Sequence, residues 1–145
     1  MIHRNELDHI LEAMLEAHED VSDLNITPGK PLQVESAGHL RCVETDPTIE
    51  RLTPFQTESL ALGLINNNPR LMDSLLRTGS CDLSYALNDT ARFRVNVFSR
   101  RGHYSIVLRK LNTEVPTLDG LRAPGIFRKI PFEKTGLILV TGATG

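Results

Sequence analysis

The segment after Gly79 constrains the fold most strongly, because apolar residues alternate there with polar ones in three successive runs. The alternating apolar positions are Leu83, Tyr85 and Leu87, then Phe93, Val95 and Val97, then Tyr104, Ile106 and Leu108. Asn88-Asp89 and Arg101-Gly102 separate the runs with residues typical of turns. A period of two predicts strands with one buried face, and short turns predict antiparallel neighbours. We therefore expect an antiparallel meander of three strands.

Before Gly79 the sequence favours helices. Over residues 5–18 the apolar positions recur at helical spacing, at Leu7, Ile10, Leu11, Met14 and Leu15. Thr53-Pro54-Phe55-Gln56 and Asn68-Pro69 each place a capping side chain before a proline. These signals predict a second helix from 54 to about 66 and a short third helix, which Gly79 ends.

The region between the first two helices predicts a hairpin of short strands over 22–38. Leu24 and Ile26 precede the turn pair Pro28-Gly29, and Leu32 and Val34 then alternate with polar residues. Together with the meander and the helices, this pattern predicts an α+β domain, an antiparallel sheet with helices packed against one face.

The composition changes after the sheet. Residues 112–124 are rich in Pro, Thr, Gly and Asp and have no periodicity, which is typical of a linker. A short helical stretch is expected over 125–130. Residues 136–140 are apolar without alternation, which favours a strand covered on both faces in a parallel sheet. We therefore expect a domain over 1–111, a linker with a short helix over 112–135 and the start of a second domain over 136–145.

Length and composition exclude several classes of protein. A chain of 145 residues holds one domain and part of a second. It contains no run of about 18 apolar residues, and its first residues lack the pattern of a signal peptide, so we expect a cytoplasmic protein. We expect Cys42 and Cys81 to be reduced, partly buried thiols, because two cysteines without a spacing pattern do not indicate a disulfide framework or a metal site. The five histidines, at 3, 9, 18, 39 and 103, show no metal-binding spacing.

Positive charge is concentrated in one segment, although the net charge is −2. Residues 91–110 contain no acid and six basic residues: Arg92, Arg94, Arg100, Arg101, Arg109 and Lys110. Strand geometry places Arg92 and Arg94 on the face opposite Phe93 and Val95. An anion site suits arginine, whose planar fork binds phosphate oxygens in pairs. A solvated basic face, or ion pairs with acids such as Glu44 and Asp46, is the alternative.

Nucleic acid is a disfavoured ligand for this basic segment, since the net charge is negative and few aromatic residues are available for base stacking. Salt-sensitive binding of oligonucleotides would favour it again.

The last five residues resemble the first half of a phosphate-binding loop. Thr141-Gly142-Ala143-Thr144-Gly145 follows the apolar run, as the glycines of such a loop follow a buried strand. Backbone N–H groups of the loop point at phosphate oxygens, and a following lysine neutralises charge. The sequence stops before that lysine, so we expect a fragment boundary inside the motif. An ordinary tight turn after a strand is the alternative.

Four segments, in order, resemble one family. They are SDLNITPGKP at 22–31, DLSYAL at 82–87, RFRVNVFSRRG at 92–102 and GLILVTGATG at 136–145. They are similar to segments of the PilT-like type IV pilus retraction and type II/IV secretion ATPase family. The retraction branch usually has a histidine where Asn25 stands and a more basic strand at 34–38. A paralogue or a secretion-system relative is therefore left open.

The resemblance implies a PAS-like N-terminal domain, a flexible linker and the first strand of a RecA-like ATPase domain, in a hexameric, cytoplasmic motor that works at the inner membrane face. ATP and Mg²⁺ would bind in the full-length protein. Arg92 and Arg94, with Arg109 as a less closely matching third, would contact phosphate, and Gly142, Ala143, Thr144 and Gly145 would form part of the nucleotide loop.

The implied partners are the protein's own ATPase domain, neighbouring subunits and an inner-membrane pilus or secretion platform protein, with no nucleic acid. This chain alone should neither bind nucleotide tightly nor hydrolyse ATP. A free-standing PAS-like sensor or protein-interaction domain is the alternative function. The sequence after residue 145 would separate the two, because only the motor requires Ser-Gly-Lys-Ser/Thr there.

Overall fold

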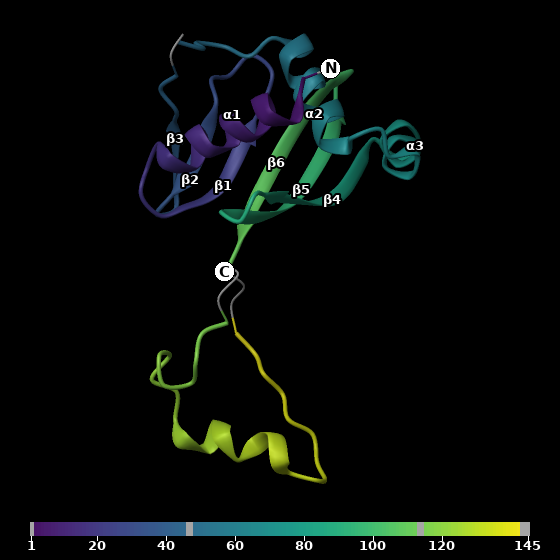
Figure 1. Ribbon diagram of the computed structural model, residues 1–145. Helices are drawn as coiled ribbons and strands as arrows, with labels where there is room; N and C mark the ends of the chain where they lie inside the picture. The colour runs from purple at the N-terminus through teal and green to yellow at the C-terminus, as the bar shows by residue number, and fades with distance from the viewer. Residues whose placement is uncertain (1, 46–47, 113–114, 143–145) are drawn as a thin grey trace. The chain divides into compact units, whose positions relative to one another are not determined.

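A computed structural model of the chain describes residues 2–45, 48–112 and 115–142 (Figure 1). The chain divides into two compact units, residues 1–113 and 114–145, and each is described by itself. The first unit is an α+β domain, as the sequence predicts, and contains the sheet.

The sheet of the first unit has six strands, and all neighbouring strands are antiparallel. In chain order they are β1 (Val21–Ile26), β2 (Gln33–Ser36), β3 (His39–Cys42), β4 (Ser80–Leu87), β5 (Ala91–Arg100) and β6 (His103–Leu111). Their order across the sheet is β3-β2-β1-β6-β5-β4. The predicted hairpin and the predicted meander are both present, and the pairing of β1 with β6 joins them into one sheet.

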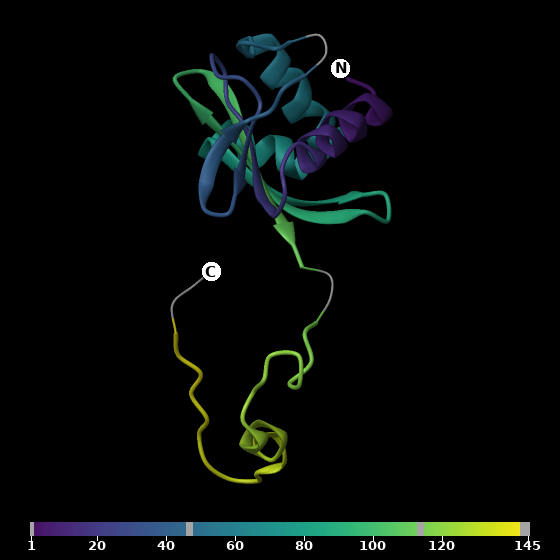
Figure 2. The same cartoon turned by 90° about the vertical axis from the view of Figure 1, so that its left-hand side faces the viewer.

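Three helices belong to the same unit: α1 (Arg4–Glu16), α2 (Pro54–Ile65) and α3 (Pro69–Thr78). The Thr53 hydroxyl accepts a hydrogen bond from the Gln56 N–H at 3.2 Å and so caps α2, and Asn68 caps α3. Gly79 ends α3 at a φ of +81°, a conformation that glycine adopts without strain. The turned view shows α1 and α2 on the same side of the sheet (Figure 2).

The core lies between this side of the sheet and the helices. Phe93, Val95 and Val97 of β5 are completely buried, as are Leu11 and Met14 of α1. This arrangement follows from the two periods in the sequence, since the apolar face of each strand meets the apolar stripe of a helix. The opposite face of the sheet carries the polar residues that alternate with the core positions.

The structure differs from the sequence expectations at three places. Strand β3 was not predicted, and all four of its residues are exposed, so it has no alternating pattern to detect. Residues 136–142 have no regular secondary structure, whereas a buried strand was expected at 136–140. A strand buried on both faces needs neighbouring strands, and none follows β6 in the described part of the chain. Cys42 is exposed, and only Cys81 is buried.

The second unit contains two short 3₁₀ helices, η1 (Gly125–Arg128) and η2 (Ile130–Phe132), where a short helical stretch was predicted. An ion pair joins Asp119 to Arg128. The apolar residues Leu137, Ile138, Leu139 and Val140 are exposed. Among the described residues, no helix combines the length and the apolar character needed to cross a membrane.

Candidate functional site

The polar face of the sheet presents the predicted arginines. Arg92 and Arg94 alternate along β5 with the buried Phe93 and Val95, so that both arginine side chains lie on the face away from the helices. Arg109 of β6 is the direct cross-strand partner of Arg94. We call Arg92, Arg94 and Arg109 the arginine face.

Arg109 is held by an acid that the sequence analysis did not identify. Its Nε donates a hydrogen bond of 2.9 Å to Oδ1 of Asp23, the opposite residue on β1. The Asp23 side chain is only 10% exposed. This hydrogen bond and the charge of Asp23, with a smaller effect of Glu35, raise the pKa of the Arg109 guanidinium above its ordinary value. In this hydrogen bond the donor is Nε of Arg109 and not one of its Nη nitrogens.

Arg94 has a looser partner. Its Nη2 lies 3.6 Å from Oδ1 of Asp82 on β4, and the two side chains are 72% and 58% exposed. Together Asp23, Arg109, Arg94 and Asp82 cross four adjacent strands, and we call them the charge row. Like charges on facing strand positions repel each other, so the two arginines depend on the acids at either end.

The charge row lines a shallow depression of about 400 Å³ on the open face, together with Asn96 and Val107. Asn96 donates a hydrogen bond to the Cys81 carbonyl. The depression is therefore lined by four charged side chains, among them the cross-strand partners Arg94 and Arg109. Such a surface can bind an anionic group, because an arginine offers several N–H donors in a fixed plane.

Arg92 lies elsewhere on this face. It lines a different depression with Asn88, Asp89 and Leu111, at the end of the β4–β5 hairpin. It forms no ion pair with any residue in the described ranges. The structure therefore brings Arg94 together with Arg109, rather than with Arg92. The register between β5 and β6 decides this, and alternation within one strand does not reveal the register.

The remaining residues that the sequence analysis named for this site stay predictions. Glu44 makes no ion pair within the described part of the chain, and Asp46 lies outside it. Gly142 is exposed, and Ala143, Thr144 and Gly145 lie outside the described residues, so the predicted nucleotide loop remains a prediction. Residues 2–45, 48–112 and 115–142 contain no group of three His, Cys, Asp or Glu side chains that could hold a metal ion.

The structure defines an α+β domain with a six-stranded antiparallel sheet that presents two cross-strand arginines on its open face. Comparison with known proteins gives the family. The chain is 34% identical over 140 residues to the type IV pilus ATPase PilU of Pseudomonas aeruginosa, covering 97% of this chain and 35% of that protein. It is 30% identical over 130 residues to the pilus retraction ATPase PilT of the same organism, covering 89% of this chain and 36% of PilT.

Solved structures agree with the sequence relatives. The crystal structure of the pilus retraction motor PilT with bound ADP superposes with a TM-score of 0.77 at 36% identity, covering 96% of this chain and 38% of that one. The ATPase DotB of Legionella pneumophila superposes with a TM-score of 0.63 at 28% identity, covering 95% of this chain and 38% of that one. No protein-family model matches the chain.

The chain belongs to the PilT-like secretion ATPase family. It spans about a third of the length of the curated relatives that it matches, and its fold resembles the N-terminal domain of PilT.

Proposed function

We propose that this chain is the N-terminal part of a hexameric, cytoplasmic motor ATPase that powers type IV pilus retraction or a related secretion machine. In this proposal residues 1–111 form a PAS-like domain, 112–135 a linker and 136–145 the start of a RecA-like P-loop domain. The names of PilT and PilU support the class of machine. The inner-membrane platform protein and the neighbouring subunits of a homohexamer would be its partners, with the ring at the membrane's inner face.

The arginine face is the observation that carries the proposed role of this domain in ATP hydrolysis. ATP with Mg²⁺ would bind between this domain and the ATPase domain of the full-length protein. Arg94 would contact a phosphate group with Arg109 beside it in the same depression, and Arg92 would contact phosphate from the separate depression that it lines. The exposed guanidinium of Arg94 fits a phosphate group.

Substitution of Arg94 tests this role in the full-length protein. Arg94→Ala should lower the rate of ATP turnover by about tenfold or more and change nucleotide affinity less, because a charge that clamps the transferred phosphate acts mainly in the transition state. Steady-state kinetics gives both quantities. Arg70→Ala is the matched control, since Arg70 is an exposed arginine of the same domain on α3. Unchanged turnover in Arg94→Ala would remove this residue from the site.

A free-standing sensor domain is the second candidate, and one feature favours it. A mostly apolar pocket of about 360 Å³ lies between α1, α2 and the segment 49–52, lined by residues including Ile10, Leu32 and Phe55. Pockets of this size accept small ligands. Similarity to motor ATPases over nearly the whole chain favours the first proposal. Phosphate-binding loop residues encoded directly after Gly145 would exclude the sensor.

A further inference from the structure

The two central arginines of the charge row have unequal partners. Arg109 donates from Nε to a nearly buried carboxylate at 2.9 Å, whereas Arg94 lies 3.6 Å from an exposed one. The first distance is that of a charge-assisted hydrogen bond, and the second exceeds hydrogen-bond range. Exposed ion pairs contribute little, because water solvates both charges and the side chains lose conformational freedom. Arg109 is therefore fixed in place, and Arg94 can leave its partner.

The two arginines place two positive charges at facing positions of the sheet, which favours the approach of a negatively charged group. They are Cα partners on β5 and β6, so their side chains rise from adjacent points of the same face. Asp23 serves Arg109 from β1, and Asp82 serves Arg94 from β4, each from the outer side of the row. A phosphate group placed in the depression over the pair could accept hydrogen bonds from both guanidinium groups, which neither aspartate does.

We propose that Asp82 is a displaceable counter-ion, which holds Arg94 over the sheet until a phosphate group of the ligand replaces it, whereas Asp23 is a permanent counter-ion that fixes Arg109. Both acids are positioning residues, since they act through the arginines. This inference rests on the proposed function, from which it takes a phosphate group as the ligand.

The two roles have opposite consequences for phosphate binding. Asp82 competes with the ligand for Arg94, so removal of its charge should strengthen binding. Asp23 leaves the Nη edge of Arg109 available and holds it in one orientation, which lowers the conformational entropy that binding must overcome. A ligand phosphate thus meets one arginine that is already placed and one that must be released.

Titration of the 145-residue chain with tripolyphosphate tests the role of Asp82. Binding is followed by NMR through the Nε–Hε signals of the arginines. Asp82→Asn should tighten binding by about two- to fivefold, the range expected for loss of an exposed ion pair. Asp73→Asn is the matched control. Asp73 also lies 3.6 Å from an arginine, Arg77, with similarly exposed side chains, and the substitution changes the net charge equally.

A double substitution separates direct competition from a general effect of charge. In an Arg94→Gln background, Asp82→Asn should give no gain in affinity, because there is no guanidinium left to release. The same spectra test Asp23. Without ligand, the Nε–Hε proton of Arg109 should exchange with water more slowly than that of Arg94, and tripolyphosphate should slow the exchange of Arg94.

Four results would overturn the proposal: no titratable binding by the unaltered chain, equal affinities of Asp82→Asn and Asp73→Asn, a gain that persists without Arg94, or equal exchange of the two protons. The motor function is read separately, from turnover of the full-length protein. Should Arg94→Ala leave turnover unchanged while Asp82→Asn tightens tripolyphosphate binding, the motor role fails and the counter-ion role stands. If Arg94→Ala lowers turnover as expected but Asp82→Asn leaves tripolyphosphate binding unchanged, the motor role stands and the counter-ion role fails.

Discussion

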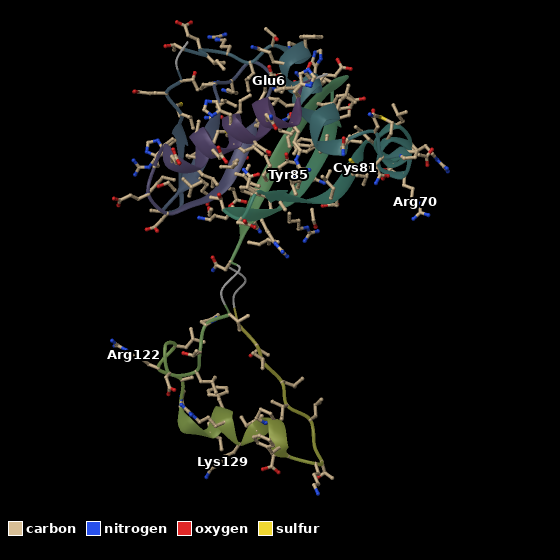
Figure 3. The ribbon with its side chains drawn as sticks, viewed as in Figure 1. Glu6, Arg70, Cys81, Tyr85, Arg122 and Lys129 are labelled. Atoms are coloured by element: carbon tan, nitrogen blue, oxygen red, sulfur yellow. The ribbon has the colours of Figure 1, made fainter. Side chains whose placement is uncertain are left out.

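At the residue scale, Cys81 and Tyr85 of β4 show how the surroundings shift the pKa of an ionisable side chain in this domain. Burial raises the pKa of the Cys81 thiol, and the neighbouring charge of Asp82 raises it further. Tyr85, which is labelled in Figure 3, lies on β4. Its hydroxyl donates a hydrogen bond of 2.6 Å to Oδ1 of Asp8 and so connects β4 to α1. Arg4 lies over the Tyr85 ring at 5.8 Å. These contacts fix the start of α1 against the sheet.

The Tyr85 contact predicts a pH dependence of stability. Burial, followed by the hydrogen bond and the charge of Asp8, raises the pKa of Tyr85 to about 12, above the value of about 10 in an unfolded chain. The folded state therefore holds this proton more tightly. The stabilisation is complete below about pH 10 and is lost as the pH rises toward 12.

Urea unfolding of the chain and of Tyr85→Phe, at intervals from pH 8 to 11.5, measures this effect. The difference in unfolding free energy should be constant below pH 10 and should shrink above it. Absorbance titration should show a tyrosinate step near pH 12 that Tyr85→Phe lacks and Tyr104→Phe retains. A difference in free energy that stays constant through pH 11.5 would contradict the assignment.

At the element scale, β5 combines the core with the site. Its apolar face is completely buried at Phe93, Val95 and Val97, and the other face carries Arg92 and Arg94. Flanked by β4 and β6, this strand has no exposed edge. Its register with β6 sets Arg94 opposite Arg109, so the packing of one face fixes the geometry of the other.

Truncation of Phe93 measures this dependence. Phe93→Ala should destabilise the domain by about 3–5 kcal/mol, because it removes a fully buried aromatic ring and leaves a cavity. Phe55→Ala is the matched control, since Phe55 is 74% exposed, and it should cost well under half as much. Chemical denaturation of both variants gives the two values. Equal losses would mean that Phe93 is not the core residue described.

The elements differ in how well the sequence predicts them. Helices α2 and α3 and the meander were predicted because caps, turns and periodicity are local signals. Strand β3 and the β1–β6 pairing were not predicted. An exposed edge strand has no alternating pattern, and pairing between strands far apart in the chain leaves no local signal in the sequence. Asp23 was missed for the same reason. Its role depends on standing opposite Arg109, and no signal within β1 marks it.

At the scale of the whole molecule, the two units differ in packing. Among the described residues, every fully buried side chain lies in the first unit, and none from 115 to 142 is buried. The predicted strand at 136–140 failed here because its stabilising partners would have to come from neighbouring strands, and local apolar character cannot provide them. The domain division at 111/112 remains a prediction from composition, although the unit boundary falls close to it.

Limited digestion with trypsin tests that division. Arg122 and Lys129 are exposed and labelled in Figure 3, and the backbone around them makes only short-range hydrogen bonds. The first cuts should fall after Arg122, Arg128 or Lys129, because exposed segments without a core are cleaved most readily. Mass spectrometry should then find a resistant product that begins near residue 1 and ends at one of these sites. First cuts within β5 or β6 would contradict the division.

The β5–β6 ladder also has a mechanical consequence. Its register runs without interruption from Arg92 opposite Leu111 to Arg100 opposite His103, so Arg94 and Arg109 are connected by a continuous set of backbone hydrogen bonds. Moving their backbones apart would break many of these bonds together. A force applied to the arginine side chains of this face would therefore be distributed over the whole β5–β6 ladder. The backbone there would resist deformation, and the side chains would move first.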